Sequence, residues 1–282
     1  MIRIYPLIFI LLWSSAFITT KPIVDNSDPF AALAFRFFFV ALGFYFFSFY
    51  LNQSLITNKR KIAEAVLSGV LFHGFYLGGV FYSISIGMPV GIAALIVTLQ
   101  PVLTNILSGP ILDEKITTQQ WIGVLLGFTG ASLVLGLDIG SGIPLLGLIA
   151  TIIALLSITI STIWQKKISK NLPLSVSNFY QAFGGCLFHV LIVIFFAEPY
   201  INFNKVFIIA MSHQVLLVSF GAFTILMFLI KKNSASKTVS IFFLIPSTSA
   251  LMAWFFLNEK LTNLDIVGFI VTSVGVYIAT RD

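Results

Sequence analysis

The chain has 282 residues, of which 58% are hydrophobic and only 9% are charged, and its formal net charge is +6. Soluble domains carry about 25% charged residues, so this composition excludes a soluble globular fold and indicates that most of the chain faces lipid. A single cysteine, Cys186, excludes an internal disulfide and any metal site built from several cysteines.

Ten apolar segments follow one another, each near the length of about 20 residues that a helix needs to cross a bilayer. The predicted spans are residues 3–20, 29–51, 62–86, 89–112, 117–137, 142–164, 175–197, 205–230, 235–257 and 262–280. The first has the apolar character of a signal peptide, but no A-x-A-like cleavage site follows it, so we expect it to be retained as a span. Alternation of period two is absent, which argues against a membrane barrel. The sequence therefore predicts an all-α integral membrane protein with ten transmembrane helices.

Lysine and arginine are distributed unevenly between the loops on the two sides of the predicted bundle. Cytoplasmic loops are enriched in these residues. With a cytoplasmic N-terminus, twelve of them fall inside and three outside, and Arg36, within a span, is the sixteenth. We therefore expect a multi-pass protein of the inner (plasma) membrane with both termini cytoplasmic. The same asymmetry explains the positive charge without a nucleic-acid partner.

An internal repeat is visible when residues 101–130 are set over residues 246–275, at a constant offset of 145. Pro101 then matches Pro246, and Glu114 matches Glu259. The repeat predicts two five-helix units, 1–140 and 141–282. Because five is odd, the second unit enters the membrane from the opposite side, as in transporters whose midplane site opens alternately to each side. The alternative is a duplication kept only for folding.

These segments together resemble the drug/metabolite transporter superfamily, EamA type. The resemblance is carried by "LLWSSAF" (11–17), by Pro29 followed seven residues later by Arg36, by residues 91–130 and by their second copy. It implies a ten-helix inverted-repeat secondary transporter of small organic metabolites, often amino acids, and frequently an exporter. It does not identify the solute.

Arg36 is the one charged residue placed deep within a predicted span, about 10 Å along the helix from Pro29. No Asp or Glu lies deep in any span, so the buried carboxylate that many coupled carriers use is missing. A buried guanidinium needs an anionic or carbonyl partner. That partner is either a carboxylate or phosphate of a substrate, or backbone carbonyls, or the nearby Asp25 or Asp28.

Other polar and aromatic residues near the midplane are candidates for contact with a solute. His73 and Tyr76 are three residues apart and share a helix face, and Gln100 adjoins Pro101, which frees a backbone carbonyl. The full candidate set is Trp13, Ser15, Arg36, His73, Tyr76, Gln100, Asn105, Ser161, Gln181 and Ser247. The structural alternative is that such groups bond within their own helix or join two helices.

Three classes of function compete for this pattern: a secondary transporter, a channel-like facilitator and a membrane-embedded enzyme. The sequence has no HExxH, no GxSxG and no deep carboxylate pair, so we predict no catalytic residue, metal or cofactor. It also lacks a repeated filter sequence or charged ring of the kind that channels use. Expected partners are a small-molecule substrate and the lipid bilayer. Gly123 and Gly127 allow close helix approach within the bundle or against a second subunit, which leaves a homodimer open.

The inverted repeat can be tested by labelling cysteines introduced at Glu114 and Glu259 with a membrane-impermeant thiol reagent added from outside. The repeat places Glu114 in a cytoplasmic loop and Glu259 in an external one, so only the second site is expected to react. Equal labelling of both loops would show that the two units share one orientation.

Overall fold

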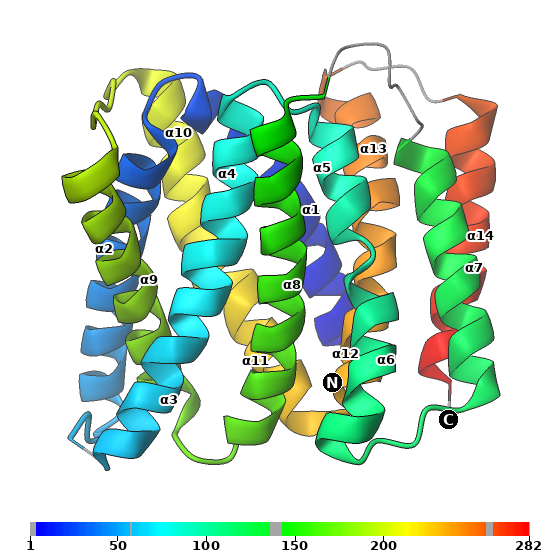
Figure 1. The fold of residues 1–282 in the computed structure, drawn as a ribbon, viewed down its shortest axis with the longest axis horizontal. Coiled ribbons are helices and arrows are strands. Elements are labelled where there is room, and N and C mark those ends of the chain that lie inside the picture. Colours follow the sequence, from blue (N-terminus) through cyan, green and yellow to red (C-terminus); the bar gives the residue numbers. More distant parts are fainter. Residues whose placement is uncertain (1–3, 57, 136–142, 258–261, 282) are drawn as a thin grey trace.

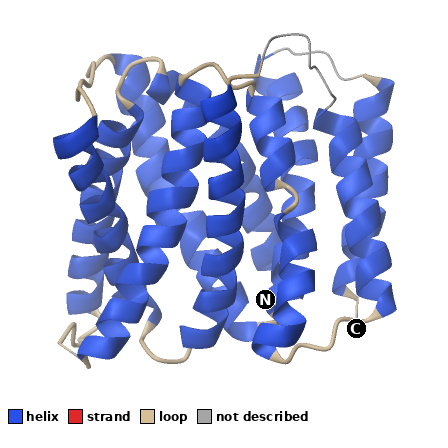
Figure 2. Ribbon diagram, viewed as in Figure 1, coloured by secondary structure: helices blue, strands red, loops and turns tan. Residues whose placement is uncertain are grey.

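The computed structural model describes residues 4–56, 58–135, 143–257 and 262–281. Most of the described residues are helical and none lies in a strand (Figure 2), so the predicted all-α membrane fold is confirmed. In chain order the helices are α1 (Tyr5–Val24), α2 (Pro29–Tyr50), α3 (Lys59–Gly69), η2 (Val70–Tyr76), α4 (Leu77–Ser85), α5 (Val90–Val97), α6 (Gln100–Leu112), α7 (Thr118–Leu135), α8 (Leu145–Ile168), α9 (Leu174–Phe196), α10 (Lys205–His213), η3 (Gln214–Ala222), α11 (Phe223–Lys232), α12 (Ala235–Ser240), η4 (Ile241–Phe243), α13 (Leu244–Leu257) and α14 (Asn263–Thr280).

Within these described ranges, nine helices are long and apolar enough to cross a membrane. The fifth predicted span, residues 117–137, falls on α7, which is 18 residues long, begins with three polar residues and is not among the nine. Figure 1 shows both ends of the described chain toward the lower end of the bundle. The loop that holds Glu114 also lies at that end, whereas Glu259 is outside the described residues.

Four of the spans depart from a regular α-helix, and the departures recur at the repeat offset. The third span contains the π-helical segment η2, and the eighth contains η3. Shifting Val70–Tyr76 by 145 residues gives 215–221, which lies inside η3. The fourth span breaks after α5, just before Pro101, and the ninth contains the 3-10 turn η4 just before Pro246. Such irregular backbone in a membrane protein is tolerated where it is buried or lines a cavity, and π-turns are frequent at functional sites.

The helices pair across the two predicted units. At one edge of the bundle α7 packs along α14, and at the other edge α2 packs along α9 (Figure 1). Between these pairs, α1 contacts α10, η3, α11 and α13 from the second unit, while α8 contacts η2, α4, α5 and α6 from the first. Each unit's first helix is therefore surrounded by the third and fourth helices of the other unit.

Glycine brings the backbones of α7 and α14 into direct contact. A Cβ added to Gly123 would lie 2.6 Å from the carbonyl oxygen of Gly275, and one added to Gly268 would lie 2.7 Å from that of Gly130. Close approach through small residues is the usual way membrane helices associate, because the hydrophobic effect does not drive them together in lipid. The neighbours of Gly123 belong to the same chain, so this glycine serves the fold, and a homodimer stays a prediction.

The glycine contact predicts the effect of a single methyl group. Gly123→Ala should lower the unfolding free energy by about 1–3 kcal/mol, because a Cβ at this position meets backbone atoms that cannot move aside as a side chain can. Thermal unfolding in detergent measures the change. Gly109→Ala is the matched control, since its Cβ would meet a described neighbour only at 3.7 Å. Equal melting temperatures for the two variants would contradict this account of the α7–α14 contact.

Candidate functional site

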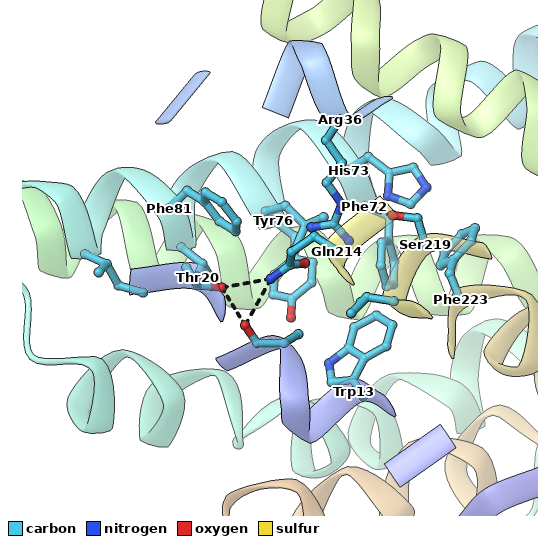
Figure 3. Close-up of a pocket in the computed structure, with 15 residues that line it drawn as sticks. Trp13, Thr20, Arg36, Phe72, His73, Tyr76, Phe81, Gln214, Ser219 and Phe223 are labelled. Carbon is cyan, nitrogen blue, oxygen red and sulfur yellow. Dashed lines mark hydrogen bonds between the residues drawn. The ribbon is translucent and has the colours of Figure 1, made fainter. Parts of the chain in front are cut away.

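A pocket of about 550 Å³, including the open space at its mouth, lies among α1, α2, η2, α4, η3 and α11. We call it the Arg36 pocket. Figure 3 shows its labelled side chains converging on one space. It is lined by Trp13, Ala16, Thr20, Arg36, Phe72, His73, Tyr76, Leu77, Val80, Phe81, Ile84, Gln214, Val218, Ser219 and Phe223. Since its walls come from both predicted units, movement of one unit against the other would change its shape.

Arg36 is 97% buried in α2 and reaches the second unit. Its relative exposure is 3%, and its Nε donates a hydrogen bond of 2.9 Å to Oγ of Ser219 on η3. Its guanidinium carbon also lies 5.3 Å from the centre of the Phe37 ring. Within the described ranges no carboxylate lies at ion-pair distance from it, and its terminal nitrogens have no hydrogen-bond partner.

The two aspartates considered as structural partners for Arg36 are engaged elsewhere. Asp25 pairs with Lys21, and Asp28 caps α2 by accepting a hydrogen bond of 2.7 Å from the backbone N–H of Ala31. The structure therefore does not support the alternative in which either aspartate neutralises Arg36. The guanidinium keeps donors available for a group inside the pocket.

His73 lies beside Arg36 on η2 without a hydrogen-bond partner. Its ring centre is 4.4 Å from that of Phe37 and 4.5 Å from that of Phe223, and neither ring nitrogen is bonded within the described protein. Its backbone carbonyl, by contrast, accepts a hydrogen bond of 2.9 Å from Nε2 of His189. A neutral imidazole has one donor and one acceptor, so both hydrogen-bonding groups of His73 are left without a partner beside the pocket.

Aromatic rings form the remaining walls around this polar centre. Phe72 lies 6.0 Å from Trp13, 5.3 Å from Tyr76 and 5.2 Å from Phe223, measured between ring centres. These four rings come from α1, η2 and α11. They give the Arg36 pocket a largely apolar wall with a few polar groups, which is the usual composition of a site for a small organic molecule.

Gln214 contributes a second polar group that the sequence did not single out. Its Nε2 donates to the carbonyl oxygen of Ala16 at 3.0 Å, and it lies 2.9 Å from Oγ1 of Thr19 and 3.3 Å from Oγ1 of Thr20. A carbonyl can only accept, so these contacts fix which end of the amide is nitrogen. The side-chain oxygen is buried without a partner, and Figure 3 shows it directed away from Thr20.

Of the ten predicted site residues, the Arg36 pocket brings together Trp13, Arg36, His73 and Tyr76. The other six are placed outside its lining. Ser15 bonds to Nε2 of His213 at 3.0 Å, Gln100 donates to Thr162 at 3.0 Å, and Asn105 accepts from Ser236. Ser247 is buried without a partner.

Ser161 and Gln181 belong to a separate polar cluster, near the end of the bundle where α8 connects to α9. Gln165 donates to Oγ of Ser161 at 3.2 Å and to Oε1 of Gln181 at 3.0 Å, and Ser68 also donates to Gln181. Gln165 and Gln181 line a second cavity of about 310 Å³, including the open space at its mouth. The repeat offset maps Thr20 to Gln165 and Arg36 to Gln181, so this second cavity is the counterpart of the Arg36 pocket, with amides in place of the hydroxyl and the guanidinium.

The described part of the chain contains no cluster of three side chains able to hold a metal ion. What the Arg36 pocket can do is bind. It presents one positive group, one unpaired imidazole and one unpaired amide oxygen within aromatic walls. This arrangement suits a small organic solute with an anionic end.

Comparison with known proteins places the chain in a family. The sequence profile of the EamA-like transporter family matches residues 3–136 and again residues 145–281. "Uncharacterized transporter YvbV" of Bacillus subtilis is 28% identical, with 76% of this chain and 69% of that protein covered. "Probable amino-acid metabolite efflux pump" of Escherichia coli is 21% identical, with 96% and 92% covered. A crystal structure of another protein shares the fold with a TM-score of 0.83, at 18% identity and over 99% of this chain and 96% of that one.

Proposed function

The chain belongs to the EamA-like transporter family, and from that membership we propose that it is a secondary transporter that exports small organic metabolites, such as amino acids or related compounds, across the inner membrane. Transport proceeds by alternating access between the two five-helix units. The observation that carries this proposal is Arg36, a buried positive charge that faces a pocket between the units and has no carboxylate partner in the described residues. The name of the Escherichia coli relative, an amino-acid metabolite efflux pump, supports the solute class.

In this proposal Arg36 binds the carboxylate of the solute. A guanidinium matches a carboxylate through two parallel hydrogen bonds, and the bond from its Nε to Ser219 leaves the terminal nitrogens for that purpose. Binding neutralises a charge that otherwise remains buried, so the solute-bound pocket is electrostatically better satisfied than the empty one.

Two charged side chains bond to the connection between α11 and α12, at the end of the bundle that we propose faces the cytoplasm. The carboxylate of Glu114 accepts hydrogen bonds from the backbone N–H groups of Ala235 at 2.8 Å and Ser236 at 3.3 Å. From the other side, Nζ of Lys166 donates to the carbonyl oxygens of Ile230 at 3.1 Å and Asn233 at 2.5 Å. Each charge is matched to the free backbone groups that a helix end presents. We call these contacts the inner clamp.

The lysine related to Lys166 by the repeat does not make the corresponding contacts at the outer end. Lys166 maps to Lys21, and Ile230 and Asn233 map to Ser85 and Met88. Lys21 instead pairs with Asp25 on its own helix. The Lys166 contacts are thus formed, whereas Lys21, at the end that we propose faces outward, is bonded elsewhere. In our proposal the inner clamp opens, and Lys21 turns to the carbonyl oxygens near Ser85 and Met88, when the protein faces the cytoplasm.

The carboxylate role of Arg36 predicts graded losses of transport. In proteoliposomes supplied with a panel of metabolites, Arg36→Gln should lower transport at low solute concentration by about 10- to 100-fold, since a hydrogen bond to a charged group contributes about 1.5–3 kcal/mol. Arg36→Lys keeps the charge but loses the planar donor pair, so its loss should be smaller. Analysis of the recovered solute also shows whether it is moved unchanged, which separates transport from enzymatic conversion.

Arg60→Gln is the control for this experiment, because Arg60 is exposed and pairs with Glu64 at the start of α3. It should transport at the parental rate. If Arg36→Gln lowers only the folded yield, and transport per folded molecule is intact, then Arg36 is a packing residue and the carboxylate proposal is wrong.

The inner clamp predicts a change in accessibility as well as in rate. In a Cys186→Ser background, a cysteine at Ser234 should react faster with an impermeant reagent from the cytoplasmic side after Glu114→Ala, because the α12 N–H groups lose their acceptor. Transport should fall in the same variant, since a transporter that cannot hold one end closed no longer couples opening to solute binding.

Asp113→Asn serves as the matched control for Glu114→Ala. Asp113 is the adjacent acidic residue, and it has a positive φ of 57°, which asparagine tolerates. Unchanged reactivity at residue 234 in Glu114→Ala would remove the inner clamp from the mechanism and leave the role of Arg36 to be judged separately.

A further inference from the structure

We propose that the Arg36 pocket selects solutes with one negative charge, no positive charge and a neutral N–H or O–H donor. N-acylated amino acids and 2-hydroxy acids fit this description, and free amino acids do not. The inference rests on the proposed transport function and narrows its solute class.

The first argument is the charge of the pocket. Among the described residues that line it, Arg36 is the only one with a formal charge. The aspartates nearest to it along the chain are occupied by Lys21 and by the start of α2. A free amino acid would bring an ammonium group with it. That group would lie close to the guanidinium, in a site of low dielectric constant where repulsion between like charges is strong, and no carboxylate would offset it.

The titratable groups around Arg36 do not remove this difficulty. Tyr76 and His73 line the same pocket. His189 bonds to the backbone of η2, and His213 bonds to Ser15 of α1. As neutral side chains they can accept a hydrogen bond from an ammonium group, but they cannot cancel its charge. A solute with a single carboxylate, in contrast, leaves the occupied site neutral.

The second argument is the amide of Gln214. Its nitrogen is held by α1, so its oxygen is the end left for a ligand, and that oxygen is buried without a partner. The side chain as a whole is 1% exposed. A buried acceptor without a donor is unfavourable, so a solute that supplies an N–H or O–H is favoured over one that supplies only a carboxylate. An amide oxygen carries no full charge, so it suits a neutral donor better than an ammonium group.

The third argument is the wall of four rings formed by Trp13, Phe72, Tyr76 and Phe223, which favours an apolar or aromatic body. A series built on one phenyl group therefore tests charge and donor separately. Phenylalanine is zwitterionic, N-acetylphenylalanine and 3-phenyllactate are anions with a neutral donor, and 3-phenylpropionate is an anion with no hydrogen-bond donor.

The experiment is calorimetric binding of these four probes to the purified full-length protein, followed by proteoliposome transport of the same compounds. N-acetylphenylalanine and 3-phenyllactate should bind at least about tenfold more tightly than phenylalanine, and 3-phenylpropionate should bind a few-fold more weakly than 3-phenyllactate, as loss of a neutral hydrogen bond implies. Arg36→Gln should abolish the binding of all three anions.

Two substitutions at Gln214 separate the donor contact from the charge. Gln214→Met removes the acceptor, so 3-phenyllactate should lose its advantage over 3-phenylpropionate. Gln214→Glu adds a carboxylate, so the preference should shift toward phenylalanine. Gln119→Met is the control, because Gln119 is exposed and bonds to the carbonyl of Ile278 at the far end of α14.

The order of affinities of the four probes for the unsubstituted protein shows by itself whether the pocket rejects a positive charge, even if the Gln214 variants fold poorly. Binding of phenylalanine as tight as that of N-acetylphenylalanine would overturn the inference, and so would the absence of Arg36-dependent binding by all three anions. If the predicted ranking is found but no probe crosses the liposome membrane, the proposed transport function fails while the recognition rule stands.

Discussion

The absence of water from the bilayer core is the constraint on which the rest of this structure depends. Every polar group within the hydrocarbon must find its partner inside the protein. This requirement determines which residues of each helix face lipid and which face the interior. Phe38, Phe46 and Phe49 cover the outside of α2, whereas Arg36 on the same helix is buried against Ser219. Because the exposed sides of the spans are largely apolar, polar groups able to contact a ligand lie in the interior, where a small number of donors and acceptors are unpaired.

The sequence predicted the spans well, because hydropathy measures the same transfer from water to lipid that the fold uses. It also identified Arg36, His73, Tyr76 and Trp13, which stand out as polar or bulky groups at the right depth. Position along the helix alone could not separate them from Gln100, Asn105 and Ser161, which are equally buried but bond to neighbouring helices. Gln214 and Ser219 were missed because their roles depend on contacts with α1 and α2, which lie almost 200 residues earlier in the chain.

The two units share a backbone pattern but have different chemistry at related positions. The Arg36 pocket has Thr20 and Arg36 where the second cavity has Gln165 and Gln181. The two amides of the second cavity bond to each other. The guanidinium of the Arg36 pocket bonds through Nε to Ser219, and its terminal nitrogens have no partner among the described residues. Related positions of the repeat therefore differ in how many polar groups are left for a ligand.

The paired π-helical segments have a consequence for how this chain tolerates changes in length. A π-turn accommodates one residue more than an α-turn, and each residue turns the helix by about 100°. Deleting one residue from Val70–Tyr76 would restore a regular helix, yet it would rotate everything beyond it relative to everything before it. If the deleted residue follows His73, this histidine keeps its place, while Leu77, Phe81 and Ile84 turn away from the cavity that they line. The register of the third helix beyond η2 is therefore as important for the cavity as the identity of the residues that line it.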